Sequence, residues 1–370
     1  MEDSGRGDWF GRGLGLVHGL WPSMDCRRYS DWGLDGLESE TALIHFIDNR
    51  QSLIGLVDGR FEHIILVSSE ISVRSVRRQS DLVEPYLKEG TQVLSGIRFG
   101  LVRYFNAKPL YYGLEDRLPT ATFELDLPSR LADSLANDNL DVALIPSVEF
   151  LRGIKEHNYI ALPGAAIGTK GVVRSVKLLS HVPPNEIHWL ALDEGSRTSQ
   201  ALCRVLLDGL YGVRPEQLEE LPIGVPPEES TADAVLVIGD RAMRLPEWRY
   251  HTVIDLGEAW NRWTGLPFVF ALWVAKPRIE LDLDQISTVL RTCREDGVAH
   301  AREIASAHAA SLGLGLEECV TYLTHQITYQ LDEPELAGLR LFAAKAEALG
   351  LVPERCDVVL HSSGNFACRG

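Results

Sequence analysis

The stretch Ala191-Leu192-Asp193-Glu194-Gly195-Ser196-Arg197-Thr198-Ser199-Gln200-Ala201-Leu202 decides the fold class of this chain. It starts as a short apolar strand and passes through small residues into a segment with apolar side chains at three- and four-residue spacing. That spacing predicts a helix over Ser199 to Leu210, which the following Tyr211-Gly212 would end. A strand that turns directly into a helix is the repeating unit of α/β proteins, so we predict an α/β fold.

The same alternation continues on both sides of this stretch, from Ile97 onward. A further helix is predicted over Ser129 to Asn137, and consecutive helices are predicted from Leu283 to Gly350. The order of strands and helices favours a mostly parallel sheet covered by helices on both faces, with ligands at the carboxyl ends of the strands. The predicted strands are Ile97 to Val102, Thr122 to Leu125, Val142 to Ile145, Val172 to Leu179, Trp189 to Ala191, Ala234 to Ile238, Thr252 to Asp255 and Phe268 to Val274.

Composition excludes several classes of protein. The chain has 370 residues, is 45% hydrophobic and carries a formal net charge of −16, which argues against broad nucleic-acid binding because phosphate contacts need clustered Lys and Arg. Its longest apolar run, Phe268 to Ala275, is far shorter than the roughly 18 residues that a membrane-spanning helix needs. The start of the chain lacks the pattern of a secretory signal, so we expect a cytoplasmic protein with reduced cysteines.

Small polar residues collect where predicted strands end. Ser147 follows a buried strand, and the hydroxyls of Ser196, Thr198 and Ser199 converge with backbone N–H groups at a helix N-terminus. Such an N-terminus binds anions, and the lack of a Gly-rich nucleotide loop favours a carboxylate over a polyphosphate. The alternative is a well-capped helix without a ligand.

Two further positions have both an ordinary and a functional interpretation. Asn106 precedes Pro109, which suits the first turn of a helix, so Asn106 is expected at or near the N-cap. Ser175 lies within the predicted strand Val172 to Leu179, where it is either a surface residue or a pocket donor. No familiar catalytic or zinc-binding motif occurs, and nothing in the sequence indicates a metal or organic cofactor.

Six segments, taken together and in their order along the chain, resemble the chorismate dehydratases of the futalosine route of menaquinone biosynthesis. They are FNAKPL (105–110), DVALIPSVEFLR (141–152), the SV at 175–176, SRTSQAL (196–202), IGD (238–240) and TGLPFVFALW (264–273). The resemblance implies a two-lobed, type II periplasmic-binding-protein-like fold and a hydro-lyase that converts chorismate to 3-[(1-carboxyvinyl)oxy]benzoate. Gly195 departs from the family pattern, which usually has a small hydroxyl residue there.

The resemblance also implies roles for individual residues. Asn106 and Ser175 match the functional pair of the family and are the predicted catalytic residues. The predicted substrate-binding residues are Ser147, Ser196, Arg197, Thr198, Ser199 and Asp240.

The domain boundaries are predicted from turn signals and from a change in residue composition along the chain. Residues 1–95 match nothing in the family and are interpreted as a largely disordered extension or a misassigned start, with one strand-like run at Phe61 to Val73 and no paired set of strands. Residues 96–181 would form the first part of lobe 1, 182–264 lobe 2, and 265–370 the return to lobe 1 with the C-terminal helices.

Two alternatives share the predicted fold. One is the 1,4-dihydroxy-6-naphthoate synthase of the same pathway, whose pattern includes a pocket His that no motif here supplies. The other is a non-catalytic solute-binding protein, which normally carries an export signal. The sequence leaves open the oligomeric state, the general acid, and whether the base is the substrate carboxylate or a side chain.

Overall fold

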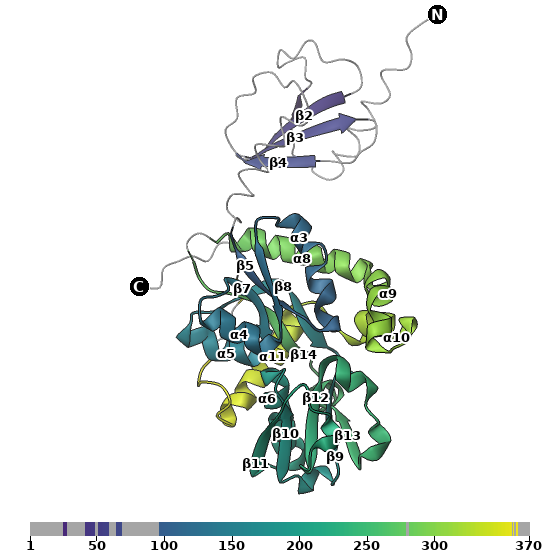
Figure 1. Ribbon diagram of the computed structural model, residues 1–370. Helices are drawn as coiled ribbons and strands as arrows, with labels where there is room; N and C mark the ends of the chain where they lie inside the picture. The colour runs from purple at the N-terminus through teal and green to yellow at the C-terminus, as the bar shows by residue number, and fades with distance from the viewer. Residues whose placement is uncertain are drawn as a thin grey trace, which may run out of the picture. The chain divides into compact units, whose positions relative to one another are not determined.

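The computed structural model describes residues 96–278 and 281–356 together with Val358, Leu360 and His361, and the backbone of four strands nearer the start of the chain. Contacts divide the chain into two units, Met1–Glu84 and Pro85–Gly370, which are described separately (Figure 1).

The first unit contains a four-stranded antiparallel sheet in the order β1-β2-β3-β4. Its strands are β1 (Asp25–Arg27), β2 (Thr41–Asp48), β3 (Gln51–Asp58) and β4 (Ile64–Ser68). The prediction that this part of the chain lacks paired strands is therefore wrong, although β4 does fall in the predicted run. The missed signal is two apolar runs separated by only two residues, which is the spacing of a hairpin. The predicted disorder of the intervening residues concerns positions outside the described ones.

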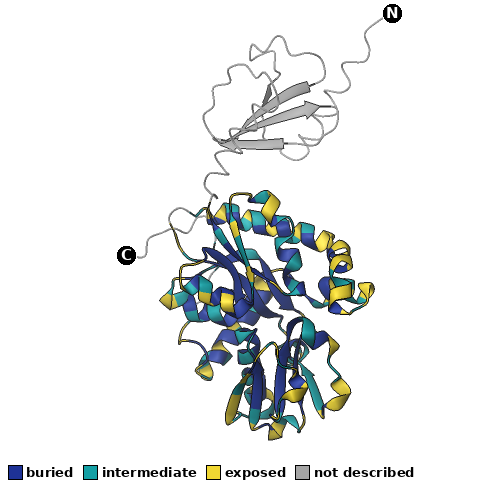
Figure 2. Ribbon diagram, in the orientation of Figure 1, coloured by how far each residue is buried: buried dark blue, intermediate teal, exposed yellow. Residues whose placement is uncertain are grey.

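The first lobe of the second unit is built on a five-stranded sheet in the order β6-β5-β7-β14-β8. Here β5 (Arg98–Val102) pairs in parallel with β6 (Thr122–Asp126) and β7 (Val142–Pro146). The strand β14 (Phe268–Ala275) runs antiparallel to β7 and to β8 (Ile160–Thr169). Helices cover both faces, and the central strands are buried (Figure 2).

The second lobe has its own five-stranded sheet in the order β11-β10-β12-β9-β13. The strand β10 (Trp189–Asp193) pairs in parallel with β11 (Gln217–Leu221) and β12 (Ala234–Ile238). The strand β9 (Val176–Ser180) is antiparallel to β12 and to β13 (Thr252–Asp255). Both sheets are thus mixed rather than mostly parallel. The chain passes from β8 of the first lobe to β9 without an intervening helix, and it returns to the first lobe at β14 after the helix α7 (Leu256–Thr264).

Helices connect and cover the strands much as predicted. The α4 and α6 helices lie at the two predicted positions, and α6 ends at Gly212 in the left-handed conformation, as the Tyr-Gly pair indicated. No helix in the described residues is long and apolar enough to cross a membrane. The helices are η2 (Phe105–Tyr111), α3 (Leu114–Arg117), α4 (Pro128–Ala136), α5 (Ser147–Glu156), η3 (Pro184–Glu186), α6 (Arg197–Tyr211), η4 (Pro227–Glu229), η5 (Gly239–Arg244), η6 (Glu247–Arg249), α7 (Leu256–Thr264), α8 (Leu283–Ala299), α9 (Ala301–Leu312), α10 (Leu316–Thr321), η7 (Tyr322–Gln326) and α11 (Glu333–Ala348).

The first crossing between lobes lies just before β9. Arg174 has a φ of 62°, a left-handed conformation that interrupts the predicted strand Val172 to Leu179, so the regular strand begins only at Val176. The carboxylate of Asp255 holds this kink by accepting hydrogen bonds from the backbone N–H groups of Val173 and Arg174. Ser175 consequently lies at the crossing rather than inside a strand, and β9 belongs wholly to the second lobe.

Candidate active site

A pocket lies between the two lobes at the carboxyl ends of several strands. Its volume is small, about 40 Å³, so the lobes are close together in this structure. Its polar lining consists of Tyr104, Asn106, Ser175, Ser196 and Ser199. The remainder is Val102, Pro128, Pro146, Ile167, Val173, Val176, Ile238, Gly239, Phe270 and Ala271. A mostly apolar pocket with a few convergent polar groups is typical of a small-molecule site.

Asn106 lies inside the first turn of η2, and this helix starts differently from the prediction. Tyr104 occupies the N-cap position, and the carboxylate of Asp240 from the second lobe accepts the hydrogen bond of the Phe105 N–H at 3.2 Å. Asn106 is therefore not the capping residue. Its buried side-chain oxygen has no hydrogen-bond partner among the described residues, although it lines the pocket. A buried unpaired acceptor costs free energy unless a ligand completes it, which supports a binding role for Asn106.

Ser175 is held by a tyrosine that the sequence analysis missed. The hydroxyl of Tyr322 donates a hydrogen bond of 2.8 Å to the Ser175 Oγ, and both side chains are buried. Since Ser175 Oγ accepts this bond, its own proton is free to point into the pocket. Tyr322 begins the π-helical turn η7, and its ring stacks on Phe105 with centroids 5.9 Å apart.

The Tyr322 phenol stays protonated at neutral pH. Burial raises its pKa, and hydrogen bonding to Ser175 and Asn106 offsets only part of that rise. Sequence reasoning could not find this residue, because it lies 147 positions from Ser175 and belongs to none of the six motifs. Only the fold brings Asn106, Ser175 and Tyr322 together.

The opposite wall of the pocket is the N-terminus of α6. Ser196 is its N-cap, and the Ser196 Oγ accepts a hydrogen bond of 3.2 Å from the Ser199 N–H. The hydroxyls of Ser196 and Ser199 also lie 2.9 Å apart. The first-turn N–H groups of a helix have no partners within it, and the helix dipole favours negative charge at this end. The predicted anion site thus faces the pocket that Asn106 and Ser175 line.

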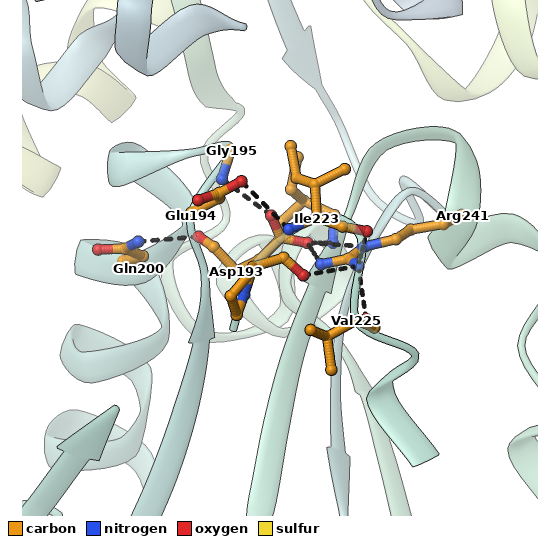
Figure 3. Close-up of polar contacts among 9 residues, drawn as sticks. Asp193, Glu194, Gly195, Gln200, Ile223, Val225 and Arg241 are labelled. Atoms are coloured by element: carbon orange, nitrogen blue, oxygen red, sulfur yellow. Dashed lines mark hydrogen bonds and ion pairs between the residues drawn. The ribbon is translucent and has the colours of Figure 1, made fainter. Parts of the chain in front are cut away.

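A buried ion pair fixes the loop before α6 (Figure 3). The carboxylate of Asp193 at the end of β10 accepts hydrogen bonds from the N–H groups of Gly195 and Ile238. It also pairs with Arg241 at 2.6 Å, while Arg241 in turn donates to the carbonyls of Ile223 and Val225. Burial raises the pKa of Asp193 despite this pairing. The network ties the ends of β10 and β12 together and so positions the helix terminus.

Four predicted substrate-binding residues do not line this pocket. Ser147 and Thr198 are fully buried at the contact between lobes, where Ser147 donates to the Val269 carbonyl and Thr198 accepts from the Val148 N–H. Their contacts hold α5 of the first lobe against α6 of the second, so for these two residues the structure offers a positioning role instead of a substrate contact.

Arg197 and Asp240 also have other partners. The guanidinium of Arg197 makes two bonds of 2.8 Å to Asp133 and lies in a separate polar cavity, away from Asn106. Asp240 holds the start of η2, and burial raises its pKa. Of the predicted set, Asn106, Ser175, Ser196 and Ser199 meet at one pocket.

Acid-base side chains and metal ligands do not contribute to this lining. The pocket has no His, Cys, Asp or Glu in its lining. In the described residues, no group of three or more His, Cys, Asp or Glu could hold a metal ion. The site offers amide, hydroxyl and backbone hydrogen-bonding groups, which bind and orient a ligand rather than donate or remove protons at neutral pH.

Comparison with known proteins identifies the family of this chain. Residues 97–348 match the family described as menaquinone biosynthesis. The chain is 33% identical over 269 residues to the chorismate dehydratase of Thermus thermophilus, covering 68% of this chain and 94% of that protein. The chain belongs to this menaquinone-biosynthesis family.

Two other comparisons extend the match. The chorismate dehydratase of Campylobacter jejuni is 26% identical over 260 residues, which cover 68% of this chain and 99% of that enzyme. Among solved structures, the periplasmic aliphatic sulphonate binding protein of Escherichia coli aligns with a TM-score of 0.50 and 13% identity, over 75% of this chain and 96% of that one. The predicted periplasmic-binding-protein-like fold is confirmed.

Proposed function

We propose that this enzyme is a chorismate dehydratase that eliminates water from chorismate to give 3-[(1-carboxyvinyl)oxy]benzoate in menaquinone biosynthesis. The observation that carries the proposal is the pairing of two walls in one pocket. One wall presents Asn106 with an unpaired oxygen and Ser175 with a free proton, and the other is the N-terminus of α6. The chemistry of this pocket suits a dicarboxylate, because each wall can hold one carboxylate, and the lobes must move apart from their spacing here to admit it.

The substrate itself supplies the base in this mechanism. Its enolpyruvyl carboxylate removes the proton from the ring carbon that bears the ether. The electron pair of that C–H bond becomes a ring double bond, and the C–O bond of the hydroxyl on the neighbouring carbon breaks. The hydroxyl departs as water with a proton that the newly formed carboxyl group or the solvent returns to it. The ring becomes aromatic, which drives the reaction. The protein then contributes orientation and electrostatics, in keeping with a pocket lined without acidic side chains or histidine.

Each polar residue has a role in this scheme. Ser175 donates to the enolpyruvyl carboxylate, and Tyr322 orients Ser175 by occupying one of its acceptor positions. The Oδ1 of Asn106 accepts a hydrogen bond from that carboxyl group once it has been protonated, which gives this buried oxygen a partner. The first turn of α6 with Ser196 and Ser199 binds the ring carboxylate.

Two rivals share the fold. A 1,4-dihydroxy-6-naphthoate synthase would need a pocket histidine, and no histidine lines the pocket here. A solute-binding protein would bind the same kind of anion without turnover. A cytoplasmic location and chorismate as the partner molecule both remain predictions, which fit a biosynthetic enzyme better than a solute-binding protein.

One assay separates these functions. Purified protein is incubated with chorismate, and the aromatic product is followed by ultraviolet absorbance and identified by mass. We expect catalytic formation of 3-[(1-carboxyvinyl)oxy]benzoate. Stoichiometric binding of chorismate without turnover would favour the solute-binding protein, and release of a dihydroxynaphthoate from the later pathway intermediate would favour the synthase.

A further inference from the structure

Tyr104 is the one polar lining residue without a role so far. It lies two residues after the end of the first lobe's β5 and lines the pocket together with Asn106 and the N-terminal serines of α6. Among the described residues its hydroxyl has no hydrogen-bond partner. Burial raises the pKa of Tyr104, and the negative charges of Asp193 and Asp240 act in the same direction. The phenol is therefore a neutral hydrogen-bond donor at neutral pH.

Two glycines of the second lobe leave room for this phenol. A Cβ atom at Gly195 would lie 2.4 Å from the Tyr104 hydroxyl, and a Cβ at Gly239 would lie 2.7 Å from the ring carbon Cε1. Gly239 also has a φ of 69°, which disfavours other residues independently. The phenol thus fills the space directly beside the Cα atoms of both glycines, so its hydroxyl lies against the loop that leads into α6.

We propose that the Tyr104 hydroxyl, which belongs to the first lobe, donates a hydrogen bond to the substrate carboxylate at the N-terminus of α6. The phenol of Tyr104 can occupy this position only because residue 195 is glycine, since a Cβ atom there would collide with the phenol oxygen. The Asp193–Arg241 network holds Gly195 in place through its N–H, as Figure 3 shows. Because Tyr104 and α6 belong to different lobes, this contact forms only when the lobes are closed on the ligand. The assignment rests on the proposed function.

The test compares Tyr104→Phe with Tyr111→Phe. Removing the Tyr104 hydroxyl should raise the KM for chorismate and the Kd for the product about 10-fold, the effect of one hydrogen bond to a charged group. Tyr111 is a matched control, because its hydroxyl donates to the Val102 carbonyl within the first lobe at 3.0 Å. The Tyr111 variant should keep the wild-type KM, and thermal unfolding should show that both variants are folded.

A double-variant cycle tests the shared space. Gly195→Ala should impair binding in the wild-type background and have a clearly smaller effect in the Tyr104→Phe background, because the colliding oxygen is gone. A wild-type KM and Kd in an active Tyr104→Phe enzyme would overturn the assignment of Tyr104 alone, and additive effects of the two substitutions would overturn the role of Gly195. A wild-type protein that does not convert chorismate would overturn the proposed function and this assignment with it.

Discussion

The two walls of the pocket differ in how far their hydrogen bonds are satisfied. On the first wall, Asn106 has an unpaired buried oxygen and Ser175 has a proton that its neighbour Tyr322 leaves free. On the second wall, the carboxylate of Asp193 is fully engaged by two backbone N–H groups and Arg241. In the proposed mechanism, the unsatisfied groups of the first wall bind the reacting part of the substrate, whereas Asp193 and Arg241 behind the second wall hold backbone groups in place. Substitutions on the first wall should therefore lower activity, and substitutions on the second wall should lower stability.

The largest effect is expected on the first wall. Asn106→Ala and Ser175→Ala should each lower kcat for chorismate about 100- to 1,000-fold, as removal of a preorganised donor or acceptor does in other enzymes. The unfolding temperature of the Asn106 variant should stay near the wild-type value, because its side-chain oxygen has no partner to lose. Ser175→Ala should lower the unfolding temperature modestly, because it leaves the buried Tyr322 hydroxyl without its partner. Steady-state rates and thermal melts measure both effects. Wild-type rates in both variants would eliminate the self-base mechanism.

On the second wall, the same kind of substitution should affect folding first. Asp193→Ala leaves Arg241 and two backbone N–H groups without their partner, so we expect a loss of about 3 kcal/mol in the free energy of unfolding. The value lies at the low end for a buried ion pair because Arg241 keeps its bonds to the Ile223 and Val225 carbonyls. Urea unfolding of this variant beside Asn106→Ala measures the difference. An equally stable Asp193 variant would mean that the two walls do not differ as described.

A smaller effect is expected for Tyr322, which in the proposed mechanism acts on the substrate only through Ser175. Tyr322→Phe keeps the ring that stacks on Phe105 and removes the bond to Ser175. We expect kcat to fall about 10-fold with little change in KM, because the substrate is still bound but its carboxylate is less well held. A rise in KM with unchanged kcat would instead indicate a ground-state contact and contradict the positioning role.

The sequence predicted the elements of this site better than their arrangement. The helix α6 and the hydroxyls near its N-terminus follow from local chemistry alone, since a strand, small residues and an amphipathic helix are adjacent in the chain. The helix begins at Arg197, two residues before the predicted Ser199. The kink at Arg174 does not, because it depends on the carboxylate of Asp255 some 80 residues later. Asn106 was expected at or near a helix N-cap, and it does lie two residues after the N-cap Tyr104, but Asp240 from the other lobe accepts the first N–H of that helix instead.

Residues that act across lobes were the ones that sequence reasoning misplaced. Thr198 and Arg197 lie in the motif of the predicted anion site, yet they contact Val148 and Asp133 of the first lobe and not the pocket. Membership of a motif identifies the segment but does not show which way each side chain points. Tyr322 shows the converse, since it lies outside every motif and still completes the site.

The smallest effect is expected from shortening the chain at its start. Both walls of the pocket lie in the unit Pro85–Gly370, and the first strand of its sheet, β5, begins at Arg98. A chain that begins near Val93 keeps this strand whole, so it should fold and retain the kcat and KM of the full-length enzyme for chorismate. A chain that begins at Arg103 is the control. It lacks β5, which lies between β6 and β7, and should not fold because that loss divides the sheet. Circular dichroism, solubility and the dehydratase assay compare the three proteins. If the chain beginning near Val93 is insoluble or inactive while the full chain works, the first unit must contribute to the fold or the pocket, and the boundary before residue 96 is wrong.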